Sequence, residues 1–116
     1  MLRDATGFSH IYVVTGRTDM RRGIDGLAAV IQNNLGLNPF EPGSIFLFCG
    51  RRSDRIKALV YEGDGFLLLY KRVAIGRFQW PRTPDEVRDL SEDEFHLLME
   101  GFSIEKTITE FTPKVL

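Results

Sequence analysis

The sequence has a single cysteine and no run of apolar residues long enough to span a membrane. One cysteine, Cys49, excludes an internal disulfide and is typical of a protein from a reducing compartment. It stands in the apolar run 45–49, which favours a buried structural thiol. The opening residues 1–4 lack the apolar stretch of a secretory signal peptide. We therefore expect a cytoplasmic protein that does not act at a membrane.

The sequence also has almost no net charge, because 15 lysines and arginines stand against 16 aspartates and glutamates. Bulk charge therefore predicts no particular partner. The charges are nevertheless uneven: basic residues outnumber acidic ones between Arg17 and Arg82, and the reverse holds from Asp85 onward. This asymmetry indicates an anionic partner for the first part of the chain, or it reflects two solvated surfaces of opposite sign.

Motifs of catalysis and metal binding are missing. The two histidines, His10 and His96, are far apart, and no residues have the spacing of metal ligands, a phosphate-binding loop or a catalytic triad. A metal-dependent nuclease could draw on only one local set, Asp54, Glu62, Asp64 and Lys57. Turn and solvent roles explain these residues better. We expect no catalytic residues, no metal and no cofactor, with a small nuclease as a third-ranked alternative.

The patterns predict one α+β domain over residues 1–116, with a compact part at about 8–102. In the tail, 103–116, helical spacing and strand-forming residues compete. Apolar patterns and turn residues predict strands over 11–14, 45–49, 55–62 and 66–73, and a short one over 77–80. Helical spacing predicts helices over 20–35 and from Ser91 onward. We expect a small antiparallel sheet of about four to five strands with two helices packed on one face.

Two helix starts have capping signals. Thr18 or Asp19 is a candidate N-cap of the first helix. Ser91 and Glu94 have the spacing of a capping box, in which each side chain bonds the other residue's backbone N–H.

The strongest turn signal is Asp64-Gly65, between two strand-like segments. A two-residue turn there would pair Lys57 with Arg72 across the strands. Like charges in such a pair are destabilising, and an anion such as a phosphate would relieve that cost.

Aromatic and basic residues interleave around this hairpin, as they do on surfaces that bind single strands or phosphate backbones. The aromatic residues are Tyr61, Tyr70, Phe78 and Trp80. The alternative is that they belong to the core and that nearby carboxylates pair with the arginines.

The segment 18–23 carries two adjacent arginines at the predicted start of the first helix. Arg21 and Arg22 oppose the helix dipole, and together with free backbone amides they could hold a phosphate. The alternative is that Asp25 pairs with one of them at helical spacing.

Four separated segments carry a family resemblance: 18–28, 50–57, 63–66 together with 70–72, and 76–81. With them the chain resembles TnpB, the accessory protein from the second reading frame of IS66-type insertion sequences, which is unrelated to the RNA-guided nuclease of the same name. The likeness covers about residues 13–101. Val60-Tyr61 and Val73-Ala74-Ile75 depart from the family pattern and indicate a divergent member.

The resemblance implies a non-catalytic accessory protein that assists DNA transposition beside a separate, larger transposase. DNA and that transposase are the expected partners. The matched basic residues are the candidate nucleic-acid contacts: Arg21, Arg22, Arg51, Arg52, Arg55, Lys57, Lys71, Arg72 and Arg77. The alternative is an adaptor that binds the transposase through its C-terminal part.

Overall fold

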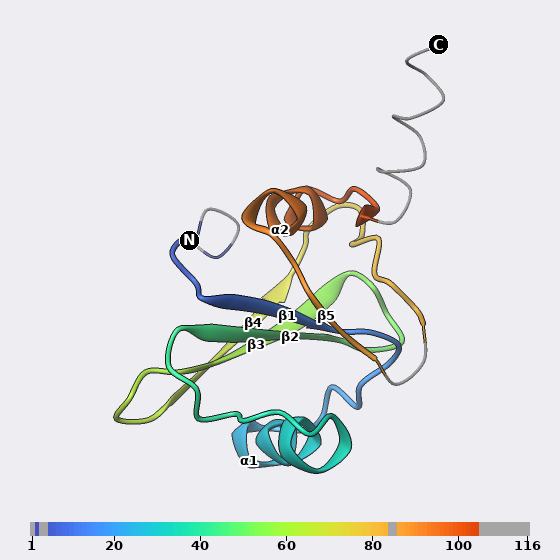
Figure 1. The fold of residues 1–116 in the computed structure, drawn as a ribbon. Coiled ribbons are helices and arrows are strands. Elements are labelled where there is room, and N and C mark those ends of the chain that lie inside the picture. Colours follow the sequence, from blue (N-terminus) through green and yellow to red (C-terminus); the bar gives the residue numbers. More distant parts are fainter. Residues whose placement is uncertain (1, 3–4, 84–85, 105–116) are drawn as a thin grey trace.

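The computed structural model describes residues 2, 5–83 and 86–104, which form one sheet with a helix on each face (Figure 1). In chain order the elements are β1 (His10–Val14), α1 (Ile24–Ala29), the π-helical η2 (Val30–Asn34), β2 (Ser44–Cys49), β3 (Arg55–Tyr61), β4 (Phe66–Arg72), β5 (Val87–Asp89) and α2 (Glu92–Met99). The α+β class expected from the sequence is confirmed.

The sheet is mixed, with the strand order β4-β3-β2-β1-β5. β1 and β2 are parallel, whereas the other three pairs are antiparallel. The sequence predicted an antiparallel sheet only. The difference arises because α1 and η2 form a crossover between β1 and β2, and such a connection returns the chain in the same direction.

The two helices cover opposite faces of the sheet, so the expectation of a single covered face is wrong (Figure 1). The residues of β2 alternate between two core clusters. Ile45, Leu47 and Cys49 belong to the cluster under α2, and Phe46 and Phe48 to the cluster under α1. Every residue of β2 is therefore buried. A strand covered on both faces has a continuous apolar run, as residues 45–49 do.

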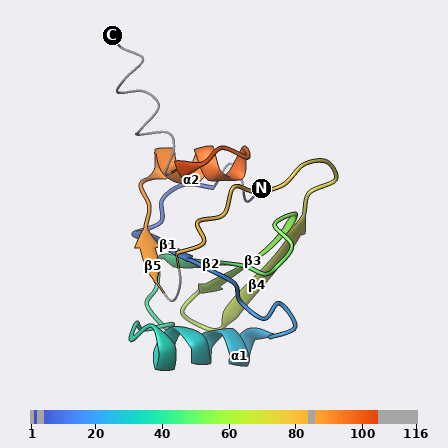
Figure 2. The same cartoon turned by 90° about the vertical axis from the view of Figure 1, so that its right-hand side faces the viewer.

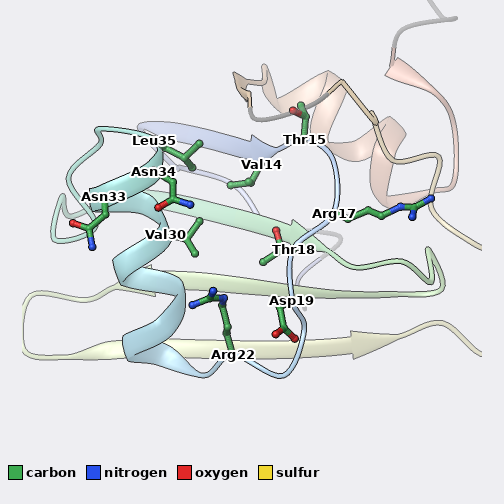
Figure 3. A pocket seen from close by; sticks show the side chains of 10 residues that line it. All are labelled: Val14, Thr15, Arg17, Thr18, Asp19, Arg22, Val30, Asn33, Asn34 and Leu35. Carbon is green, nitrogen blue, oxygen red and sulfur yellow. The ribbon is translucent and has the colours of Figure 1, made fainter.

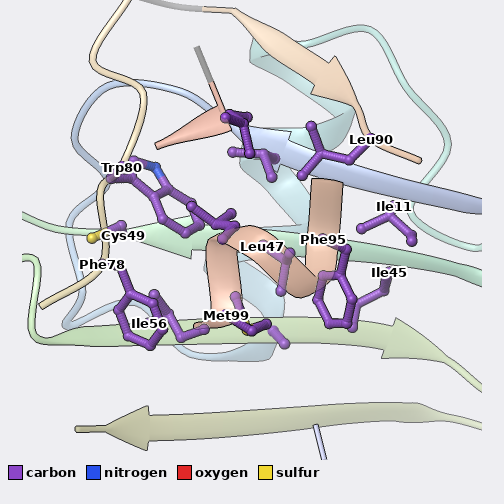
Figure 4. Close-up of a cluster of buried hydrophobic side chains, with 14 residues drawn as sticks. Ile11, Ile45, Leu47, Cys49, Ile56, Phe78, Trp80, Leu90, Phe95 and Met99 are labelled. Atoms are coloured by element: carbon purple, nitrogen blue, oxygen red, sulfur yellow. The ribbon is translucent and has the colours of Figure 1, made fainter. Parts of the chain in front are cut away.

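The core on the α2 side also takes up two aromatic residues from the segment after β4 (Figure 4). Phe78 and Trp80 are 2% and 6% exposed, and the Trp80 Nε1–H donates to the Val14 carbonyl at 3.0 Å. The strand predicted over 77–80 does not form, because this segment is anchored through its side chains. The fifth strand is instead β5, at the edge beside β1.

The first helix begins at Ile24, four residues later than predicted, and its N-cap is Gly23 rather than Thr18 or Asp19. It continues as η2, where Leu35 N–H donates to the Val30 carbonyl at 3.2 Å. The capping box of α2 is confirmed: Glu94 N–H donates to Ser91 Oγ, and Ser91 N–H donates to Glu94 Oε1.

The hairpin forms at the predicted place, but its register differs by two residues. The turn is Gly63-Asp64, with Gly63 at a φ of 95° and the Glu62 N–H donating to the Gly65 carbonyl. Lys57 therefore pairs with Tyr70 rather than with Arg72. A shift of two residues leaves each side chain on its predicted face. The like-charged pair across the strands is Arg55 and Arg72.

At the C-terminus, Ile104 is buried in the α2-side core. The tail from residue 105 lies outside the described residues, so the competing predictions for it stay predictions. In the described ranges, no helix has both the length and the apolar character of a membrane span.

A histidine joins β1 to the short edge strand β5. His10 Nδ1 lies 2.7 Å from Asp89 Oδ2, and His10 Nε2 lies 3.9 Å from Glu41 Oε1. The hydrogen bond with Asp89 raises the pKa of His10 above 6.5. The interaction of the protonated imidazole with Asp89 stabilises the fold at acid pH. This contribution is lost as the pH rises through the pKa of His10 in the folded protein.

We predict that Asp89→Asn lowers the pKa of His10, measured by NMR titration of its imidazole, because the charged acceptor is lost. The imidazole resonances of His96 on α2 should be the same in both proteins. The stability difference between the wild type and this variant should be largest near pH 5 to 6 and should shrink toward pH 8. A difference that grows over that range would contradict the assignment.

Candidate nucleic-acid interface

The strand directions bring most of the arginines to one end of the sheet. β1, β2 and β4 end there and β3 begins there, so the loops after β1, β2 and β4 are neighbours. Figure 2 views the molecule from this side, which we call the basic end. Of the eleven arginines in the sequence, nine lie in these loops or at the adjoining strand termini: Arg17, Arg21, Arg22, Arg51, Arg52, Arg55, Arg72, Arg77 and Arg82.

A glycine brings the first two loops into direct contact. Thr18 N–H donates to the Cys49 carbonyl at 2.9 Å. A Cβ added at Gly50 would lie 2.5 Å from Met20 Cγ and 3.3 Å from the Thr18 carbonyl oxygen. The two loops therefore pack closely only because residue 50 has no side chain.

The two loops line an open cavity of about 560 Å³, which we call the basic hollow. Arg21 lines it from the first loop, and Arg51, Arg52 and Arg55 line it from the second. Guanidinium groups converging on one hollow are suited to phosphate or another anion.

The segment after β4 joins the same region. Val73 N–H donates to the Asp54 carbonyl at 2.8 Å, and Phe78 N–H donates to the Ser53 carbonyl at 2.7 Å. These bonds place Arg77 beside Arg51 and Arg52 around a second, smaller cavity of about 300 Å³. Three of the segments that carry the family resemblance thus meet at the basic end.

Two carboxylates partly neutralise these arginines. Asp19 accepts from Arg21 Nε and Nη2, both at 3.0 Å, and from the Arg21 backbone N–H. These bonds lower the pKa of Asp19 to about 2. Asp54 accepts from Arg55 Nε at 3.0 Å and lies 3.6 Å from Arg52 Nη2, and the bond from Arg55 lowers the pKa of Asp54. One alternative from the sequence paired Asp25 with Arg21 or Arg22; the structure pairs Arg21 with Asp19 instead.

The other candidate residues divide into three groups. Among the described residues, no carboxylate lies within ion-pair distance of Arg51, Arg72 or Arg77, and all three are exposed. Lys57 Nζ donates to the Arg22 carbonyl at 2.9 Å and lies 5.9 Å from the centre of the Tyr70 ring. Lys71 pairs with Ile56, whose side chain is buried in the core on the α2 side. Side chains of paired residues share a face of the sheet, so Lys71 faces the α2 side.

The predicted interleaving of aromatic and basic residues is found at one position only. Phe78 and Trp80 belong to the core. Tyr61 lies in a cluster with Phe40 and Phe66 at the hairpin turn, the opposite end of the sheet. Tyr70 alone is well exposed beside the basic residues, with 57% of its surface accessible. The basic residues therefore surround the open end of the hairpin rather than its turn.

Two arginines outside the predicted set also belong to the basic end. Arg82 Nη1 donates to the Gly16 carbonyl at 2.7 Å, and its Nη2 lies 3.9 Å from the buried Cys49 Sγ. Arg17 follows β1 directly and lines a third cavity of about 520 Å³, between its loop and η2 (Figure 3). Its place just after a strand was the available sequence signal.

The residue set of a possible nuclease is not brought together. Asp54 precedes β3, whereas Glu62 and Asp64 follow it, and the strand between them spans roughly 20 Å. Within the described ranges, no three histidine, cysteine or acidic residues are grouped as metal ligands would be.

Known proteins similar to this chain include members of one family. Residues 9–109 match the family described as IS66 Orf2 like protein. The uncharacterized protein y4jC of Sinorhizobium fredii is 36% identical over 91 residues, which are 78% of this chain and 77% of that protein. The uncharacterized protein y4hO of the same organism is also 36% identical over 91 residues, 78% of each chain. No solved structure matches.

We predict that Gly50→Ala lowers the free energy of unfolding by about 1–3 kcal/mol, because the new methyl group overlaps Met20 and approaches the Thr18 carbonyl. Urea denaturation would measure the change. Gly23→Ala is the matched control, since an added Cβ there meets nothing within 4 Å and the φ of −95° suits any residue. Equal losses in the two variants would contradict the close packing of the loops.

Proposed function

This chain belongs to the family of IS66 Orf2-like proteins, and from that premise we propose that it assists transposition by binding DNA through its basic end. The family makes it an accessory protein associated with the transposition of an insertion sequence. DNA binding through the basic end is our proposal, and it depends on the convergence of nine arginines at one end of the sheet.

The charge and the exposure of this end support contact with a phosphate backbone. Arg51, Arg72 and Arg77 are exposed, and no described carboxylate pairs with them. Phosphate contacts by such residues release counterions from DNA and supply most of the affinity that does not depend on sequence. The arginines of the basic end come from the loops after β1, β2 and β4, so together they form one surface for a phosphate backbone.

The ion pairs at this end restrict which arginines are free to bind a phosphate. Asp54 pairs with Arg55 at 3.0 Å and lies 3.6 Å from Arg52, and Asp19 pairs with Arg21. These pairs are the alternative that the charge pattern left open, and they reduce the positive charge at this end. The proposal therefore depends most on Arg51, Arg72 and Arg77.

A second candidate function, docking on the transposase, is favoured by the surface around α2. Its exposed residues include Glu92, Asp93 and Glu100, and Phe102 just beyond it is 55% exposed. An acidic surface with an exposed aromatic residue suits a basic protein partner better than it suits DNA.

We predict that the double variant Arg51→Ala/Arg77→Ala weakens DNA binding about tenfold or more at low salt. For duplex DNA, the negative slope of log K against log salt should become shallower by about two, because two phosphate contacts are lost. Fluorescence anisotropy would measure both. Lys71→Glu changes the net charge by the same amount on another face and should have a much smaller effect. Failure of the wild type to bind single- or double-stranded DNA would refute the proposed function.

For the docking alternative, we predict that the transposase of the element copurifies with the wild type and not with the variant Glu100→Lys/Phe102→Ala, because an exposed acidic residue and the exposed aromatic side chain of this surface are lost. Thermal unfolding of the variant provides the control for folding. Copurification with both proteins would exclude this surface as the docking element.

A further inference from the structure

The third cavity adjoins the basic hollow, and the two share Thr18 and Asp19. We call it the amide hollow, after Asn33 and Asn34 of η2, which line it opposite the loop after β1 (Figure 3). Its volume of about 520 Å³ is within the range of small-molecule sites, roughly 300–1,000 Å³. Short π-helical segments such as η2 are frequent at functional sites.

The lining of the amide hollow combines apolar, amide and charged surface, and Arg17, Asp19 and Arg22 provide the charges. Val14, Val30 and Leu35 provide an apolar wall. Asn33 and Asn34 provide carboxamides, which are exposed and form no hydrogen bond with any residue that the structure describes. A carboxamide can donate and accept at once, as the edge of a nucleobase requires, and asparagine pairs with adenine in this way.

We propose that the amide hollow holds the base of an unpaired nucleotide while the arginines of the basic hollow hold the adjoining phosphates. This proposal rests on the proposed function and makes it specific: the ligand is DNA with an unpaired base, such as a single strand. In a duplex, the stacked bases face one another, and a base can enter a protein pocket only when it leaves the stack. The two hollows share Thr18 and Asp19, so they are adjacent.

The test compares a labelled single strand with the duplex of the same sequence by fluorescence anisotropy. We expect the wild type to bind the single strand at least tenfold more tightly. The variant Asn33→Ala/Asn34→Ala should lose about tenfold toward the single strand, since a well-made contact with one base is worth about 1–3 kcal/mol. Toward the duplex it should lose less than twofold. The matched control is Gln32→Ala, an exposed amide of η2 that does not line the hollow.

A second measurement uses a single strand with abasic sites. It should bind the wild type more weakly than the intact strand, and it should bind the asparagine double variant and the wild type equally. Equal affinity of the wild type for single strand and duplex, or unchanged single-strand binding by the double variant, would overturn the amide hollow as a base site. In either case the salt-sensitive loss in Arg51→Ala/Arg77→Ala would still support DNA binding.

Two further results would also overturn the proposal. If neither DNA binds at low salt, the amide hollow and the proposed function fail together. If an RNA strand of the same sequence binds more tightly than the DNA strand, the ligand is not DNA. Circular dichroism and thermal unfolding of each variant establish that the loss of binding is not a loss of the fold.

Discussion

Burial of β2 on both faces is the constraint on which the other features depend. Its side chains alternate between the cluster under α1 and the cluster under α2. Since neither helix can leave its face without exposing apolar surface, β1 and β3 are fixed beside β2. The loop that leaves β2, with its arginines, therefore starts from a strand that is buried along its whole length.

The parallel pairing of β1 and β2 determines where the charges meet. Both strands end on the same side, and Gly50 lets their loops touch. β3 begins and β4 ends at the same end of the sheet, so residues from distant parts of the sequence converge at the basic end. Hydrogen bonds from Arg21 and Arg55 keep the pKa values of Asp19 and Asp54 low, and these two carboxylates pair with three of the arginines.

Much of the fold could be predicted from residue patterns, because the strands have apolar runs and the capping box of α2 is a local signal. The hairpin register could not, since Glu62-Gly63-Asp64-Gly65 offers glycine on either side of Asp64. The parallel pair and the second covered face had signals in the predicted strand-helix-strand order and in the continuous apolar run 45–49, which the antiparallel prediction did not use. For the candidate site, the basic motifs were visible and Arg17 had a signal in its place just after a strand, but the burial of Phe78 and Trp80 and the contribution of Arg82 required the folded chain.

The hairpin has opposite charges at its two ends. Arg55 and Arg72 pair at the open end, whereas Glu62 precedes the turn and Asp64 lies in it. The molecule is thus electrically polar along the sheet although its net charge is −1. A polyanion within about one Debye length, roughly 8 Å at physiological salt, exerts a torque that turns the arginine side toward it before contact. Orientation during the encounter is therefore set by the strand directions, not by the overall charge.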